Sequence, residues 1–157
     1  MTVLLLAGLL AACQQAPPAP PPTTTSAPTS AQNGYGATER AFVELAIATD
    51  EQALRLVQLT DRPELAQNRS TELVELRKLL DGPFVNNHGG HDMPGMPTDA
   101  EIELAAKDGD ALRQFVHAHL TESLEVLRSA GSAITHPPTA AVVDLMERHR
   151  TAELAAG

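Results

Sequence analysis

The sequence predicts an all-α protein, an up-down four-helix bundle of two helical hairpins with a short extra helix in the connection. Three observations support this fold class. Aromatic residues make up only 3% of the chain and Trp is absent, which disfavours a β-sandwich. Alanine and leucine, both strong helix formers, are abundant. Apolar residues also recur three and four positions apart in several long stretches, which is the spacing of one helix face.

The N-terminus, residues 1–13, has the features of a bacterial lipoprotein signal peptide. The run "VLLLAGLLAAC" is apolar but too short to span a bilayer. It ends in Leu10-Ala11-Ala12-Cys13, which resembles a lipobox, so we expect lipidation of Cys13. Because no Lys or Arg precedes the run, we expect the true start to lie upstream. Cys13 is the only cysteine, so no other thiol remains for a disulfide or a thiolate metal ligand.

Residues 14–37 are rich in Pro, Thr and Ser and predict a disordered tether. The folded domain is expected over 38–157, about 120 residues, which is enough for one modest core. Its hairpins are expected at 38–82 and 110–157, joined by a loop and a short helix at 83–109. The net charge of −9 gives nucleic acid no electrostatic footprint, so we expect no nucleic-acid partner.

The first hairpin is predicted from capping and stop signals. Thr38 is expected to cap a helix from Glu39 to about Leu59. Pro63 opens the second helix, and Asp81-Gly82-Pro83 ends it. The inward face of the first helix is expected to carry Phe42, Leu45, Ala46, Thr49, Ala53, Leu56 and Val57.

The second half begins with a capping box. Thr98 and Glu101 predict the start of a short helix that ends near Gly109. A long helix follows over 110–130, and a last helix over 139–155. The inward residues are expected to be Leu112, Phe115, Val116, Leu120, Val126 and Leu127 in the long helix, and Val142, Leu145 and Met146 in the last one.

The two halves resemble a diverged repeat. "FVELAIATDEQALRL" from Phe42 and "FVHAHLTESLEVLRS" from Phe115 begin alike and keep an arginine in register. "RSTEL" from Arg69 and "RTAEL" from Arg150 also match. Two related hairpins fit an up-down bundle, although Leu- and Ala-rich helices also match by chance.

The connection contains a group of soft metal ligands, "HGGHDMPGM". His88, His91, Met93 and Met96 fall within nine residues, and imidazole with thioether suits copper, especially Cu(I). The glycines allow so short a segment to wrap an ion. The alternative is that Met93 and Met96 pack on the bundle while the two histidines are solvated.

A second candidate metal site lies on the predicted helices. His119 falls on the apolar face of its helix, with Glu122 one turn further on, and His149 on the apolar face of the last helix. In an antiparallel hairpin the two histidines would be level. The alternative is a hydrogen-bonded polar spot in the core. His117 points away from that face and is expected to be solvated.

The segment from His88 to Leu120 is similar to the Met-Pro-Gly-Met linker, short helix and following long helix of the domain of unknown function 305 family. This resemblance implies a ferritin-like four-helix bundle in the bacterial envelope, with copper binding in some members. The family pattern F-x-x-x-M-I-x-H-H-x-x-A places a His-His pair on the long helix of each half. Here the His-His positions hold Thr49-Asp50 and Glu122-Ser123, and the Met positions hold Ala46 and His119. We therefore take the fold from the resemblance and leave the His-His site aside.

No catalytic pattern stands out. No His has a Glu three residues before it, which a ferritin-like di-iron site requires, and no phosphate loop or nucleophile elbow occurs, so we expect no enzyme. The leading hypothesis is an extracytoplasmic helical-bundle lipoprotein, anchored to the bilayer by acylated Cys13, that binds copper through the His/Met loop for sequestration or handover. The alternative is a metal-free structural or protein-interaction module of the envelope.

Overall fold

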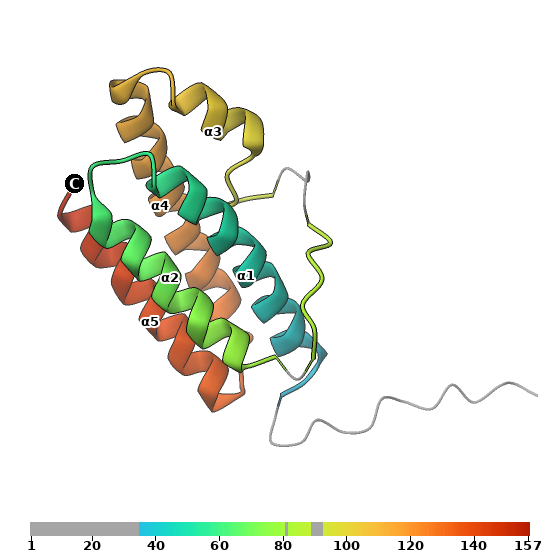
Figure 1. Cartoon of the computed structure of the whole chain (residues 1–157). Coiled ribbons are helices and arrows are strands. Elements are labelled where there is room, and N and C mark those ends of the chain that lie inside the picture. Colours follow the sequence, from blue (N-terminus) through green and yellow to red (C-terminus); the bar gives the residue numbers. More distant parts are fainter. Residues whose placement is uncertain (1–34, 81, 89–92) are drawn as a thin grey trace, which may run out of the picture.

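The computed structural model describes residues 35–80, 82–88 and 93–157. Within these ranges the regular secondary structure is helical and no strand forms, so the all-α prediction is confirmed. The helices in Figure 1 are α1 (Ala37–Val57), α2 (Pro63–Lys78), α3 (Asp99–Ala105), α4 (Gly109–Gly131) and α5 (Pro137–Ala155). The predicted signal peptide, Cys13 and most of the predicted tether lie outside the described residues, as do Asp81 and His91. In the described part of the chain, no helix is both long and apolar enough to cross a membrane.

Helix α1 begins earlier than its sequence predicts. Gly36, not Thr38, precedes its first residue. The Glu39 carboxylate accepts a hydrogen bond of 3.0 Å from the Gly36 N–H, and others of 3.2 and 3.1 Å from the Thr135 N–H and hydroxyl. Because Glu39 reaches back to the free N–H of Gly36 and across to the α4–α5 turn, the prediction of a Thr38 cap is wrong.

The other helix starts follow their local chemistry. Pro63 occupies the first position of α2, as predicted. The capping box before α3 is confirmed, since Thr98 Oγ1 accepts from the Glu101 N–H at 3.3 Å and Glu101 Oε2 accepts from the Thr98 N–H at 2.8 Å. Asp108 caps α4 through the N–H groups of its first turn. Helix α5 begins at Pro137 rather than Thr139, because proline is compatible with the first helical turn.

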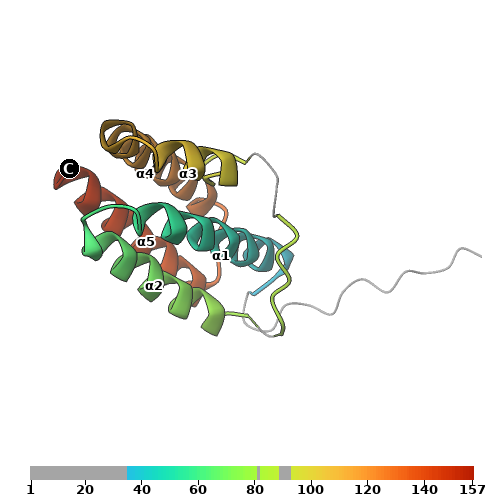
Figure 2. The ribbon, with the colours of Figure 1, turned by 45° about the horizontal axis from the view of Figure 1, so that its top comes forward.

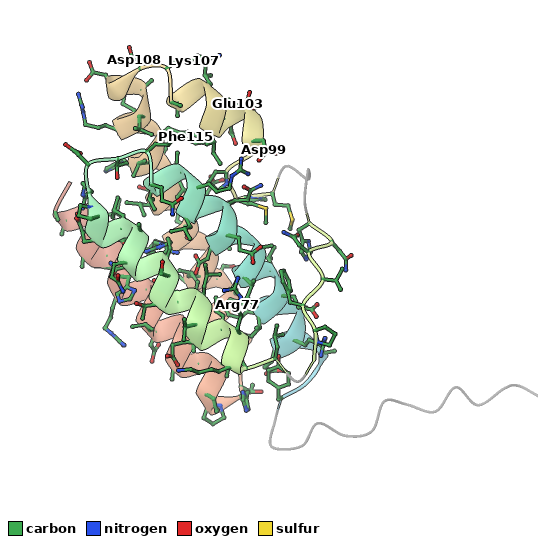
Figure 3. The ribbon with its side chains drawn as sticks, viewed as in Figure 1. Arg77, Asp99, Glu103, Lys107, Asp108 and Phe115 are labelled. Atoms are coloured by element: carbon green, nitrogen blue, oxygen red, sulfur yellow. The ribbon has the colours of Figure 1, made fainter. Side chains whose placement is uncertain are left out.

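The helices pack as two pairs. Helix α1 lies along α2, α4 lies along α5, and α2 and α5 also pack together, whereas α1 and α4 contact each other little. Helix α3 lies beside α4 near the C-terminal end of α1 (Figures 1 and 2). Asp99, at the start of α3, accepts hydrogen bonds from Arg55 and Gln52 of α1 (Figure 3). This contact ties the connection to the end of the first hairpin.

The apolar core has two parts. One is formed by Val43, Ala46, Ile47, Leu73, Leu76, Leu127, Val142 and Met146, and the other by Leu56, Val57, Leu65, Ile102, Ala105, Val116 and Leu120. The predicted inward residues Val142 and Met146 of α5 are buried, and Leu145 is half-buried.

The inward face of α1 differs from the prediction. Phe42, Leu45 and Thr49 are only half-buried, whereas Val43, Ile47 and Asp50 are fully buried. The helix is turned because it must contact α2 closely and α4 only lightly, and because its buried Asp50 carboxylate accepts a hydrogen bond from Arg150 of α5.

Candidate functional site

The Met-Pro-Gly-Met segment forms a tight turn against α4. The Met96 N–H donates to the Met93 carbonyl at 3.0 Å, and Gly95 has φ +76°. Pro94 at the second position and a glycine with positive φ at the third define a type II β-turn. A Cβ at Gly95 would lie 3.4 Å from the Ser123 Cα, so the turn lies directly on the α4 backbone.

A cavity of about 390 Å³ lies between this turn, α3 and α4. Its lining includes Met93 and Met96 from the predicted loop site, and His119 and Glu122 from the predicted helical site. Glu101 of α3 also lines it. Two of the four predicted loop ligands and two of the three predicted helical ligands therefore line the same cavity.

Phe115 forms part of the same wall. Its side chain lies between α4 and α3 (Figure 3) and packs against the core cluster that contains Ile102 and Ala105. Met96 is buried and Met93 is half-buried, so one thioether belongs to the core side of the cavity and the other is reached more easily from solvent.

His119 is buried in α4 and lines the cavity. Only 3% of the residue is exposed, and its Nε2 atom has no hydrogen-bond partner among the described residues. Burial lowers the pKa of His119 to about 4, and the positive charge of Arg69 adds to this shift. The imidazole is therefore neutral at physiological pH, which is the form that binds metal ions.

Of the other predicted ligands, His88 and His149 do not line this cavity, and His91 lies outside the described residues. His88 is half-buried, and its backbone N–H donates to Asn86 Oδ1 at 2.9 Å. His149 Nδ1 lies 2.6 Å from Glu72 Oε1. The predicted group of His119, Glu122 and His149 is therefore divided, and no three His, Cys, Asp or Glu side chains of the described residues are grouped so as to hold a metal ion.

Two further histidine and carboxylate positions on α4 are exposed to solvent. Glu122 is exposed at the rim of the cavity. His117 is exposed on α4, as predicted.

A buried charge cluster occupies the interior between the two apolar cores. It consists of Asp50 of α1, Arg69 and Glu72 of α2, and Arg150 and Glu153 of α5, none of them more than 3% exposed. Charged residues are seldom buried unless they are paired, so such a cluster requires a near-complete set of partners.

Arg150 is the centre of this cluster. Its Nη1 donates to Glu72 Oε1 and Oε2 at 3.1 and 3.0 Å, and its Nη2 donates to Asp50 Oδ1 at 2.8 Å. Its Nε donates to the hydroxyl of Ser123 at 3.1 Å. One guanidinium therefore binds groups from α1, α2 and α4, and holds the first hairpin and α4 to α5.

The cluster has an internal symmetry. Arg69 Nη2 donates to Glu153 Oε1 at 2.6 Å, while Arg150 donates to Glu72. Each Arg-x-x-Glu of one hairpin thus pairs with the Arg-x-x-Glu of the other. These are the two segments "RSTEL" and "RTAEL" that the repeat aligns. The sequence patterns did not identify the cluster, because charged residues on helices are expected at the surface; the repeated motif was the available signal.

The carboxyl groups of the cluster outnumber its guanidinium groups. Burial raises the pKa of Glu72, and the neighbouring Asp50 raises it further. Burial also raises the pKa of Asp50, to about 6, and the two carboxyl groups are close enough to influence each other's pKa. The pair therefore retains a proton at neutral pH, which leaves two carboxylates facing two guanidinium groups.

No protein-family model, curated protein or solved structure matches this chain. The chemistry of its side chains is therefore what indicates its function. The buried charge cluster is filled by its own arginines and serves the fold, whereas the cavity beside the turn presents thioethers and an imidazole to a space large enough for an ion.

Proposed function

We propose that this protein binds copper in the cavity between the Met-Pro-Gly-Met turn and α4, for sequestration or handover, as an extracytoplasmic lipoprotein anchored through Cys13. The observation that carries the proposal is the placement of Met93 and Met96 at one cavity with His119. Thioether and neutral imidazole together favour Cu(I) over hard cations.

The fold we propose is the up-down, ferritin-like four-helix bundle, in a divergent member of the domain of unknown function 305 family. The pairing of α1 with α2, of α4 with α5 and of α2 with α5 supports this arrangement. The reciprocal Arg-x-x-Glu pairs support a repeat of two hairpins.

Copper binding is expected to depend on the two loop methionines. The test is a Cu(I) titration of the full chain against a competing chromophoric chelator, with Cys13→Ser to remove the only thiol. The double variant Met93→Leu/Met96→Leu keeps the apolar volume but removes both sulfur ligands, so its affinity is expected to fall by at least about 100-fold.

Met146→Leu is the matched control, since Met146 is buried in the apolar core away from this cavity. Its affinity for Cu(I) is expected to equal that of the parent. Equal affinity in the double variant would instead support the metal-free envelope module, in which buried Met96 only packs the turn onto α4.

The anchor has a separate test. Cys13→Ala is expected to move the protein from the membrane fraction to the soluble extracytoplasmic fraction, because stable anchoring requires acyl chains on that thiol. Fractionation followed by immunoblotting measures this. Retention of the variant in the membrane fraction would contradict lipidation.

A further inference from the structure

The proposed function names a cavity with two thioethers and an imidazole, but it does not assign the ligands of the ion. We propose that His119 of α4 is the third ligand, so that Met93, Met96 and His119 form a three-coordinate Cu(I) site. His88, the loop histidine that the structure describes, is not part of this site. This inference rests on the proposed function and specifies its ligands.

The first support is the state of His119 itself. Val116, Leu120 and Leu124 are the neighbouring apolar residues on the buried face of α4. The buried Ser123 hydroxyl on that face is bonded to Arg150, whereas His119 Nε2 has no partner among the described residues. A buried polar group without a partner destabilises the folded state, because it has given up its hydrogen bonds to water. An ion in the adjacent cavity gives the imidazole the partner that the described residues do not supply.

The second support is register. The turn lies on α4 at Ser123, which a Cβ on Gly95 would approach to 3.4 Å. His119 is four residues before Ser123, so it lies one helical turn away on the same face. The thioethers on either side of Gly95 and the imidazole therefore reach one cavity from two walls.

The third support is the poor fit of a hard-metal alternative. Glu101 Oε2 already accepts hydrogen bonds of 2.8 Å from both the N–H and the hydroxyl of Thr98, as part of the α3 cap. Glu122 is exposed at the rim. Since no group of three His, Cys, Asp or Glu side chains forms among the described residues, the remaining ligand set is two sulfurs and one nitrogen. Such a set favours Cu(I).

The test uses the full chain with Cys13→Ser, Cu(I) as the probe and a competing chelator. His119→Leu is expected to lower the affinity by at least about 100-fold. His119→Met, which replaces one soft ligand by another, is expected to stay within about tenfold of the parent. X-ray absorption of the Cu(I) complex is expected to show sulfur and nitrogen neighbours in the parent and sulfur alone in His119→Met.

Two variants serve as matched controls. His117→Leu removes an exposed imidazole from the same helix, and His88→Gln removes the described loop histidine; both are expected to bind Cu(I) like the parent. His119→Leu is also expected to unfold in urea at no lower concentration than the parent, because it replaces a buried imidazole whose Nε2 has no partner among the described residues. Loss of binding in a folded His119→Leu variant supports ligation.

The outcomes separate the two proposals. If the parent itself binds no Cu(I), the proposed function fails. If Met93→Leu/Met96→Leu loses binding while His119→Leu keeps it, the function stands and the three-ligand site is overturned. A spectrum that shows only sulfur in the parent overturns it as well.

Discussion

Replacing Arg150 with methionine is expected to lower the free energy of unfolding by about 3–5 kcal/mol. Arg150 is completely buried and donates hydrogen bonds to Glu72, Asp50 and Ser123. Without it, the carboxyl groups of the buried charge cluster lose their main counter-charge while they remain out of water. Urea unfolding at pH 7, followed by circular dichroism, measures the loss.

Arg148→Met is the matched control. Arg148 lies two residues earlier on α5 and is exposed, so the same substitution is expected to change stability by no more than about 0.5 kcal/mol. The Arg150→Met loss is also expected to shrink at acid pH, because protonated carboxyl groups need no guanidinium partner. A loss under 1 kcal/mol at pH 7 would contradict the central role of Arg150.

The second large effect is a decline of stability at alkaline pH. Burial raises the pKa of Glu72, so between its ordinary value of 4.5 and its folded value the native state binds a proton that the unfolded state has lost. Stability therefore falls as pH rises, by up to about 1.4 kcal/mol per pH unit for one proton. Urea unfolding midpoints at several values from pH 6 to 9 test this.

Glu72→Gln is expected to flatten this alkaline decline, because the amide cannot ionise and resembles the protonated acid. Glu75→Gln, on the same helix but half-exposed and paired with Lys78, is expected to leave the slope unchanged. Equal slopes in the parent and in Glu72→Gln would show that Glu72 does not carry the proton.

At acid pH, the buried His119 has the opposite effect on stability. The pKa of His119 is lowered from 6.5 to about 4, so the unfolded state binds the extra proton between those values. Stability therefore falls as pH drops from 6.5 toward 4, and this offsets the carboxyl contribution in the same window. The two contributions cancel between about pH 4.5 and 6.5, so the parent is expected to lose stability mainly above pH 6.5, and Glu72→Gln keeps only the acid decline.

Local signals predicted the helices well. Pro63, the Thr98–Glu101 box and the Gly-Pro stop after α2 act through the backbone of the next few residues, so a short window of sequence contains what decides them. The rotation of α1 was not predictable in this way. Whether Phe42 or Val43 faces inward depends on how closely α2 and α4 approach, and that is a property of the whole fold.

The candidate site was predicted only in pieces. The sequence identifies Met93, Met96 and His119 as possible metal ligands from their chemistry. It does not predict that they share a cavity, because His119 lies more than twenty residues after Met96. The residues Met-Pro-Gly-Met favour a type II turn, but they do not determine where that turn packs on α4. The pairing of His149 with His119 is predicted only from their equal distance from the turn between their helices. In the structure, Glu72 of another helix lies 2.6 Å from His149 Nδ1.

The uneven packing of the four long helices has a consequence for how this protein can change over evolutionary time. The charged contacts that hold the hairpins together lie mainly between α2 and α5, while α1 and α4 contact each other little. The cavity lies between α4, α3 and the Met-Pro-Gly-Met turn, and none of the residues that line it belongs to the buried charge cluster. Substitutions at Met93, Met96 or His119 therefore change the chemistry of the cavity while the Arg-x-x-Glu pairs between the hairpins stay intact, so the same fold is compatible with different cavity linings.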